Sequence, residues 1–356
     1  MLIRLPAMQF RGGTSKGVYL LRDDLTPYAD SLDAVLSALM GGAPRQIDGL
    51  GGAATTTSKV AIIGRSSEDG IDVDYLFAQV DPQTGKVDWI PTCGNILAGV
   101  GPFAIERGLV SVAGDTTAVR IRLLNTGARV VATVQTPNGA VEYSGDQAIA
   151  GVSGTAAPVQ LTFTDFAGGT TGTLFPTGQR VDHIDGVEVS CVDAGVCAIL
   201  MRATDLGMIG AESPAEINAD TALLDRIERV RLKAGELMGM GDVGGKVVPK
   251  VMLVSGSEVA DVRSRYLVPT SCHPAHAVSG AINLASSLSI PGTVAYGLGD
   301  HGSAPGGIGI EHPGGVIELA VTLDGDAPVG ASITSTARKL SDGVVFFEFD
   351  ASAKER

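Results

Sequence analysis

Apolar and polar residues alternate along this chain with two periods, which together predict many short strands and a few helices. Apolar residues spaced three and four apart predict a helix over Ser31–Met40. A second helix is predicted over Gly94–Glu106, and Gly108 supplies its stop signal. Short apolar runs in the first half predict strands at Leu2–Leu5, Lys16–Leu21, Lys59–Ile63, Ile71–Val80, Val119–Leu124 and Val130–Val134.

The second half of the chain repeats this plan. An amphipathic helix is predicted over Ala219–Met238, and a helix of small residues over Ala275–Leu288. Residues 148–178 are rich in Gly and Thr and lack a period, so we predict domains at 1–178 and 179–356. The strands predicted in the second half are Val187–Val192, Ala198–Ala203, Val251–Val254, Arg263–Val268, Val316–Leu323 and Val344–Phe349.

Each half contains one helix rich in Ala, Gly and Ser, and a cysteine precedes both. Cys93 comes before the first of these helices and Cys272 before the second. Glycine destabilises a helix by up to about 1 kcal/mol relative to alanine, so neither helix is expected to be stable without support. Small side chains let strands pack closely around a helix. We therefore predict an α+β fold of two similar domains, each with strands wrapped around a central helix.

Composition restricts the partners of the protein. Its 356 residues carry a formal net charge of −13, with a sequence pI near 4.8, which argues against nucleic acid or an anionic membrane as a partner. A small anionic substrate remains compatible, because local backbone amides can bind it. The four cysteines lack CxxC spacing, and no apolar run reaches about 20 residues. Because no signal-peptide pattern opens the chain, we expect a cytoplasmic protein.

The first candidate for chemistry is Cys93, which stands directly before Gly94 and Asn95 at the predicted helix start. The unpaired N–H groups and the positive dipole end of a helix favour a thiolate and can also hold a carboxylate or an enolate. The alternative is that Cys93 is a small buried hydrophobic residue and Gly94-Asn95 is a turn. The local sequence leaves both interpretations open.

The second candidate is Lys59, which opens an apolar strand after the glycine-rich turn at Gly51-Gly52 and a run of hydroxyl residues. A lysine that faces a cleft is desolvated and becomes a usable proton carrier. The alternative is a solvated lysine at a strand edge, which is the commoner situation.

The third candidate is the loop Arg11–Gly17, in which Thr14 and Ser15 offer hydroxyls and amides for a carboxylate. It is no P-loop, because the Gly-x4-Gly-Lys-Ser/Thr spacing is absent, and the same test fails at Gly241–Lys246. Either segment can simply be a turn.

A metal site is an alternative at Cys272, His273 and His276. Zinc needs further ligands, and the sequence contains neither an HExxH motif nor a CxxC pair, so we expect no metal. His312 ends a glycine-rich loop and either turns the chain or contacts a ligand.

Taken together, these segments resemble the methylaconitate isomerase family of the diaminopimelate-epimerase-like fold. Within the family, the segments around Asp74–Val80 and Cys93–Val110 look most like the 4-oxalomesaconate tautomerase branch, which acts in bacterial breakdown of aromatic acids. The matching motifs, in order over nearly the whole chain, are Arg11–Gly17, Gln46–Gly52, Thr57–Val60, Cys93–Asn95, Val192–Ala194 and His312–Gly315.

The resemblance implies a cofactor-independent proton shift in an unsaturated tricarboxylate, with an active site in the cleft between the two domains. It implies Lys59 as the base, while Cys93 is a second acid or only lines the pocket. It leaves a homodimer open. The residues that we expect to bind the carboxylates and the enolate are Thr14, Ser15, Lys16, Gly51, Gly52, Gly94, Asn95, His273, Ser279, Gly280 and His312.

Three alternatives to an isomerase of 4-oxalomesaconate remain. The protein can act instead on methylaconitate, aconitate or methylitaconate. It can be a two-cysteine racemase or epimerase with Cys93 and Cys272 as opposed acid and base, although His273-Pro274 follows the second cysteine where a Gly-Thr/Ser-Gly type turn is expected. It can also be a non-catalytic ligand-binding protein that keeps the fold.

Overall fold

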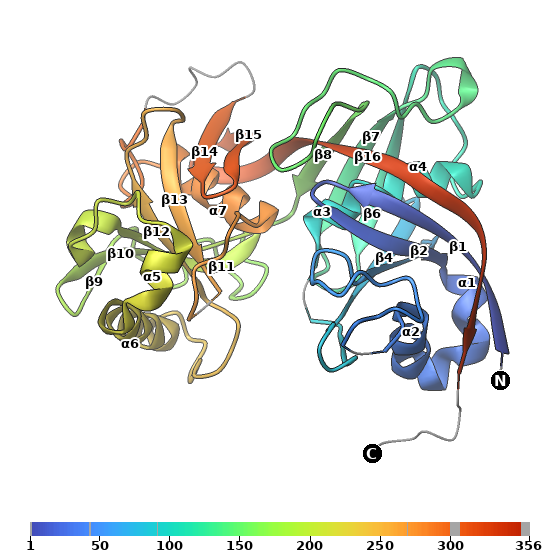
Figure 1. Ribbon diagram of the computed structural model, residues 1–356. Coiled ribbons are helices and arrows are strands. Elements are labelled where there is room, and N and C mark those ends of the chain that lie inside the picture. Colours follow the sequence, from blue (N-terminus) through green and yellow to red (C-terminus); the bar gives the residue numbers. More distant parts are fainter. Residues whose placement is uncertain (1, 43, 91, 269, 300–306, 350–356) are drawn as a thin grey trace. The chain divides into compact units, whose positions relative to one another are not determined.

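The computed structural model describes residues 2–42, 44–90, 92–268, 270–299 and 307–349 (Figure 1). None of the helices in these ranges is long and apolar enough to cross a membrane. The chain forms two compact units, Met1–Leu161 with Thr334–Arg356, and Thr162–Ile333.

The first unit is a sheet that closes on itself. Hydrogen-bonded neighbours follow the order β1-β2-β3-β4-β6-β7-β8-β16, and β16 pairs again with β1. The pairs β1–β2, β3–β4 and β6–β7 are antiparallel, whereas β2–β3 and β4–β6 are parallel. The strands are β1 (Leu2–Gly12), β2 (Ser15–Leu21), β3 (Lys59–Arg65), β4 (Val73–Val80), β5 (Val87–Asp88), β6 (Thr116–Leu123), β7 (Arg129–Gln135), β8 (Pro158–Thr164) and β16 (Ala327–Glu348).

Helices cover both faces of this sheet. On one face, α3 contacts β1, β2 and β3, and α4 contacts β3, β6 and β7, with half of α3 and most of α4 buried. On the other face, α2 packs its buried apolar residues against a cluster that includes Phe347 near the C-terminal end of β16. The helices and 3-10 turns of the unit are α1 (Arg22–Leu25), η1 (Thr26–Ser31), α2 (Leu32–Met40), α3 (Gly94–Leu97), α4 (Val100–Glu106) and η2 (Pro137–Gly139).

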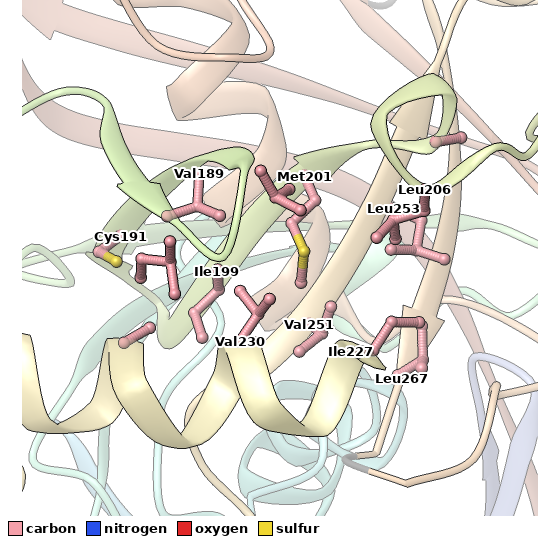
Figure 2. Packing of buried hydrophobic residues seen from close by; sticks show 14 of the residues in the cluster. Val189, Cys191, Ile199, Met201, Leu206, Ile227, Val230, Val251, Leu253 and Leu267 are labelled. Carbon is pink, nitrogen blue, oxygen red and sulfur yellow. The ribbon is translucent and has the colours of Figure 1, made fainter. Parts of the chain in front are cut away.

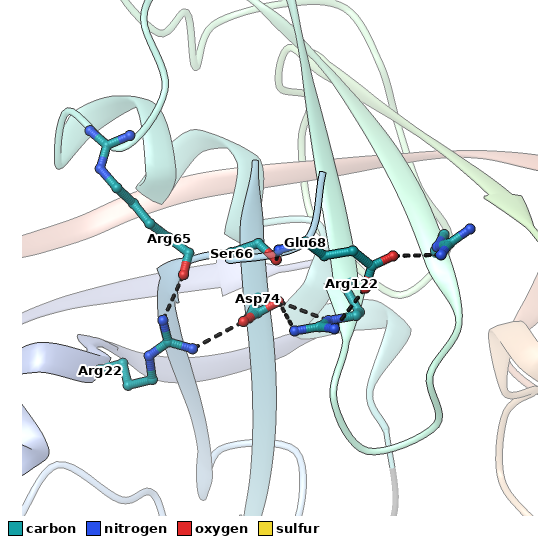
Figure 3. Close-up of polar contacts among 7 residues, drawn as sticks. Arg22, Arg65, Ser66, Glu68, Asp74 and Arg122 are labelled. Carbon is teal, nitrogen blue, oxygen red and sulfur yellow. Dashed lines mark hydrogen bonds and ion pairs between the residues drawn. The ribbon is translucent and has the colours of Figure 1, made fainter. Parts of the chain in front are cut away.

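An ion-pair network connects β4 and β6 of the first unit (Figure 3). Asp74 of β4 is nearly buried and pairs with Arg22 at 3.0 Å and with Arg122 of β6 at 2.9 Å. Arg122 also pairs with Glu68 at 2.6 Å. Because Asp74 is compensated from two sides, its burial is tolerated, and the network fixes β4 against β6.

The second unit also wraps strands around one helix. The strand order is β16-β15-β14-β13-β12-β11-β10-β9, and the buried helix α7 contacts β10, β11, β12, β14 and β15. On the opposite side, Ile227 and Val230 of α6 point toward the apolar residues of β10–β13 (Figure 2). The elements are β9 (Asp182–Ile184), β10 (Val187–Ala194), β11 (Val196–Arg202), η3 (Ala203–Leu206), α5 (Pro214–Ala219), α6 (Thr221–Leu237), β12 (Lys250–Ser255), β13 (Val262–Leu267), α7 (Val278–Ser289), β14 (Ile308–His312) and β15 (Gly315–Asp324).

Two predicted helices have different bounds in the structure. The one expected over Gly94–Glu106 becomes α3 and α4, because the Gly99 N–H donates to the carbonyl of Ile96 three residues back and forms a tighter turn. The one expected over Ala219–Met238 is α6, which begins one residue after Asp220, whose side chain accepts the Leu223 N–H at 2.9 Å. The separate helix α5 precedes it.

The domain boundary also differs from the one expected at residue 178. The first unit comprises Met1–Leu161 and also Thr334–Arg356. The C-terminal half of the chain is therefore divided between the two units. The physical reason is the pairing of β16 with the whole of β1, from Leu2 opposite Glu348 to Gly12 opposite Ala337. Residues 148–178, expected to be irregular, also contain β8.

Candidate active site

Lys59 is the first residue of β3, and neighbouring strands fix its side chain. Parallel pairing with β2 places Gly17 beside it, and antiparallel pairing with β4 places Gln79 opposite. Lys59 Nζ donates a hydrogen bond of 2.7 Å to Gln79 Oε1 and lies 5.1 Å from the centroid of the Phe77 ring. The Gln79 amide nitrogen donates to the Ser58 carbonyl at 2.9 Å, which fixes the amide orientation. The half-buried amine therefore has a neutral acceptor as its partner.

Cys93 directly precedes a helix, as predicted, but α3 spans only 4 residues. The Cys93 side chain is nearly buried, with 9% of the residue exposed. Its carbonyl accepts hydrogen bonds from the Leu97 N–H at 3.0 Å and from the Tyr75 hydroxyl at 3.4 Å. Burial, and then the neighbouring Cys93, raise the pKa of Tyr75 well above its usual range, so this phenol stays a neutral donor.

The loop Arg11–Gly17 lies against the start of α3. The Thr14 N–H donates to Asn95 Oδ1 at 3.2 Å, which brings these two predicted site residues together. Gly13 has φ +51°, and a Cβ there would lie 2.2 Å from the same Oδ1, so this turn requires glycine. Ser15 is buried, whereas the Lys16 side chain is half-buried and its N–H is donated to a loop carbonyl.

The glycine-rich turn before Lys59 is organised by a buried glutamine. Gln46 Oε1 accepts the Ser58 hydroxyl at 2.5 Å, which holds the turn against the start of β3. The Gly51 N–H is already donated to the Met40 carbonyl at 3.2 Å, so this amide is not available to a carboxylate. Gly51 therefore helps to fix the turn, and its role in binding substrate stays a prediction. Gly52 is exposed.

In the second unit, the rings of Tyr266 and His276 lie near His273 and His312, the two histidines predicted to bind substrate. The Tyr266 ring lies 4.9 Å from the ring of His276 and 6.4 Å from that of His273, and the rings of His276 and His312 are 6.4 Å apart. His273 Nδ1 accepts the Ala275 N–H at 3.0 Å. Burial, and then the charges of His273 and Arg265, lower the pKa of His312. No set of three or more His, Cys, Asp or Glu side chains in the described ranges is arranged to hold a metal ion.

His276 itself is a neutral residue of fixed tautomer. Its Nδ1 lies 3.0 Å from the Ala277 carbonyl, which can only accept, so Nδ1 carries the proton. Its Nε2 then accepts the Ser264 hydroxyl at 3.1 Å. Burial lowers the pKa of His276 to about 4. The ring therefore ties the residue before α7 to β13 without bringing a charge.

Ser279 and Gly280 lie in the first turn of α7, as predicted. A Cβ at Gly280 would lie 2.6 Å from the Tyr266 ring and 3.0 Å from the His276 ring, so only glycine lets the helix start approach these rings. Ser279 is half-buried. The described contacts thus place Gly280 beside His276, and His276 beside His312.

Cys272 does not have the surroundings of a reactive thiol. It belongs to the apolar core of the second unit and is 4% exposed. Burial raises the pKa of its thiol, and the charge of Arg265 opposes this shift only in part. Because burial keeps this thiol protonated, Cys272 is not poised as the base that the two-cysteine racemase alternative needs.

Sequence reasoning missed several residues that support the candidate groups. Gln79 is the polar residue of β4 directly opposite Lys59, and a polar residue near the end of the run Val73–Val80 is the signal that identifies it. Tyr75 lies in the same strand, but nothing in the local sequence relates it to Cys93. His276 was noticed only as a metal-ligand alternative. The location of the site between the two domains stays a prediction.

Comparison with known proteins identifies the family. Residues 2–348 match the PrpF protein family. The chain is 47% identical to the 4-oxalomesaconate tautomerase of Pseudomonas putida, covering 96% of both chains. It is 47% identical to the (4E)-oxalomesaconate Delta-isomerase of Novosphingobium sp., covering 96% of this chain and 97% of that one. The crystal structure of a methylitaconate-delta-isomerase superposes with a TM-score of 0.90 at 34% identity, over 100% of this chain and 99% of that chain.

The fold and these matches define an isomerase. The chain belongs to the PrpF protein family, and the resemblance to methylaconitate isomerases inferred from its motifs is confirmed. The expected diaminopimelate-epimerase-like fold is confirmed as well.

Proposed function

We propose that the protein catalyses a proton shift, keto–enol or 1,3-allylic, in an unsaturated tricarboxylate, with 4-oxalomesaconate as the first candidate substrate. The names of the two relatives at 47% identity, a tautomerase and a Delta-isomerase of oxalomesaconate, support this choice. The proposal includes a role in the breakdown of aromatic acids and a cytoplasmic location. A homodimer stays a prediction.

The observation that carries the proposal is the partner of Lys59. Its amine is half-buried and is held at 2.7 Å by the neutral amide of Gln79. No ion pair joins Lys59 to a carboxylate within the part of the chain that the structure describes. A carboxylate would hold the proton on the amine, whereas a neutral amide orients the amine and leaves it able to exchange the proton.

In the proposed reaction, the Lys59 amine removes a proton from a carbon next to a conjugated carbonyl. The electron pair of the C–H bond passes into a dienolate, and the ammonium returns a proton at another position, so the enzyme is unchanged. Cys93 is a second acid or lines the pocket. The groups proposed to bind the carboxylates and the enolate are Thr14, Ser15, Lys16, Gly51, Gly52, Gly94 and Asn95 in the first unit, and His273, Ser279, Gly280 and His312 in the second.

A substrate panel tests the proposal. Turnover of 4-oxalomesaconate, methylaconitate, aconitate and methylitaconate is followed by ultraviolet absorbance and chromatography. We expect turnover with 4-oxalomesaconate and a loss of about 10²–10⁴-fold in kcat for Lys59→Met, the range typical of a lost general base. The control is Lys86→Met, which removes an exposed lysine of the same unit. No turnover of any of the four compounds would contradict the proposal and favour the non-catalytic alternative.

A further inference from the structure

A pocket in the first unit lies beside two arginines that face each other. In the antiparallel pair β1–β16, Arg11 stands directly opposite Arg338, so both side chains project from the same face. They line a cavity of about 190 Å³. Ser153 and Thr155, from the loop that precedes β8, and Thr336 of β16 also line it.

Among the described residues, the acceptors that bind the two guanidinium groups are uncharged. Arg11 Nη1 donates to the Gly13 carbonyl at 2.9 Å and to both oxygens of Thr336, at 3.0 and 3.1 Å. Arg338 Nη2 donates to the Thr155 carbonyl at 3.2 Å. Within the described residues, neither arginine forms an ion pair with a carboxylate. Most of the ion pairs in these residues do contain an arginine.

Arg11 is half-buried, and Arg338 opposite it is exposed. Like charges directly opposite each other on paired strands destabilise a sheet. Burial is the larger cause of the lowered pKa of Arg11, and the charge of Arg338 lowers this pKa further. An anion between the two groups would offset the repulsion and accept hydrogen bonds from both guanidinium groups.

We propose that the pocket between Arg11 and Arg338 is a binding site for a small oxyanion, either phosphate or a carboxylate group. Guanidinium groups bind both through paired, charge-assisted hydrogen bonds, and the neighbouring hydroxyls supply further donors. The volume suits such an ion and is below the range of roughly 300–1,000 Å³ typical of pockets for larger ligands. Because Arg11 also holds the Gly13 carbonyl, a bound anion stabilises the turn whose Thr14 contacts Asn95.

Binding is tested on the full chain in the absence of an isomerase substrate, so that its failure is distinguishable from failure of the proposed function. Inorganic phosphate and malonate are titrated separately by calorimetry and by thermal denaturation, with sodium chloride at equal ionic strength as the reference. We expect a saturable heat and a rise in Tm with at least one of the two probes. A response to phosphate alone identifies a phosphate site, and a response to malonate alone a carboxylate site.

The matched variants are Arg338→Leu, Arg338→Gln and Arg4→Leu. Arg4 lies on the same strand pair, over the ring of Phe346, and its loss makes the same change of charge away from the pocket. We expect both Arg338 variants to bind at least about tenfold more weakly, as for loss of charge-assisted hydrogen bonds, while Arg4→Leu binds as the wild type does. Equal binding by all four proteins, or no response beyond that to chloride, would overturn the proposal.

Discussion

At the scale of single residues, the partner of Lys59 determines what its amine can do. Replacing Gln79 by Glu keeps the shape of the side chain but places a carboxylate 2.7 Å from the ammonium. Because a carboxylate favours the charged amine, we expect kcat/KM at neutral pH to fall and the pH profile to shift toward higher pH. The measurement is kcat/KM between pH 6 and 10 for wild type and Gln79→Glu.

The control for this change is Gln83→Glu, which adds the same charge at an exposed position of the following turn. It should leave the pH profile where it is. An unshifted profile for Gln79→Glu would mean that the Lys59 amine does not limit the reaction.

The second prediction at this scale concerns Cys272. Because its thiol is buried in an apolar core and its pKa is raised, we expect Cys272→Ala to retain kcat within about threefold. A modest loss of stability, of about 1–2 kcal/mol, is expected from the missing buried sulfur. Activity and denaturant unfolding are measured on the same sample. Loss of activity in a stable variant would revive the two-cysteine mechanism.

The third prediction concerns the pH dependence of stability at His276. The unfolded chain binds a proton at this residue near pH 6.5, whereas the folded chain does so only near pH 4. The contribution of the neutral ring is therefore complete above pH 6.5 and is lost as the pH falls toward 4. The difference corresponds to about 3 kcal/mol.

Denaturant unfolding at pH 4, 5, 6 and 7 checks this prediction. The comparison is His276→Asn, whose amide nitrogen can still donate to the Ala277 carbonyl but does not titrate. The variant should show a shallower fall of unfolding free energy below pH 6.5 than the wild type, whatever its stability at pH 7. Parallel curves for the two proteins would show that burial of His276 does not contribute.

At the scale of secondary structure elements, the junction of α3 and α4 depends on the absence of a side chain. A Cβ at Gly99 would lie 2.4 Å from the hydroxyl oxygen of the buried Tyr19, whose ring cannot move away. Although Gly→Ala in a helix normally stabilises by up to about 1 kcal/mol, we expect Gly99→Ala to destabilise by about 1–3 kcal/mol.

Thermal and denaturant unfolding of Gly99→Ala measure this effect. Gly343→Ala is the control, because a Cβ there meets nothing within 4 Å. A stabilised Gly99→Ala variant would show that helix propensity outweighs the contact with Tyr19.

Much of the element pattern was accessible from the sequence, since apolar periodicity located both central helices and Lys59 at the start of its strand. The division at Gly99 was not accessible, because the Ile96 carbonyl that accepts the Gly99 N–H also accepts the hydroxyl of Tyr19, 77 positions earlier in the chain than Ile96. The occupied amide of Gly51 was hidden for the same reason: its acceptor, the Met40 carbonyl, belongs to another element. The local sequence predicts which residues are candidates for the site. Contacts with other elements determine which of their backbone groups already have a hydrogen-bond partner.

At the scale of the whole molecule, the two ends of the chain belong to one folding unit. Phe347 of β16 is 6% exposed and packs in the core of the first unit, while its neighbour Phe346 is 59% exposed. Truncating a buried Phe costs about 3–5 kcal/mol, so we expect Phe347→Ala to destabilise strongly and Phe346→Ala weakly.

Hydrogen exchange followed by mass spectrometry shows where the destabilisation acts. In Phe347→Ala, faster exchange is expected in β1 and its neighbours of the first unit, with little change in Thr162–Ile333. Faster exchange chiefly in Thr162–Ile333 would contradict the assignment of the C-terminal strand to the first unit.

The central claim is that Lys59 moves a proton of an unsaturated tricarboxylate, and solvent exchange tests it most directly. Proton NMR of 4-oxalomesaconate in heavy water is recorded with wild-type protein and with Lys59→Ala. We predict that deuterium enters the carbon that loses its proton with wild type only. Exchange that persists in Lys59→Ala would contradict the role of Lys59, and no exchange with wild type would contradict the choice of substrate.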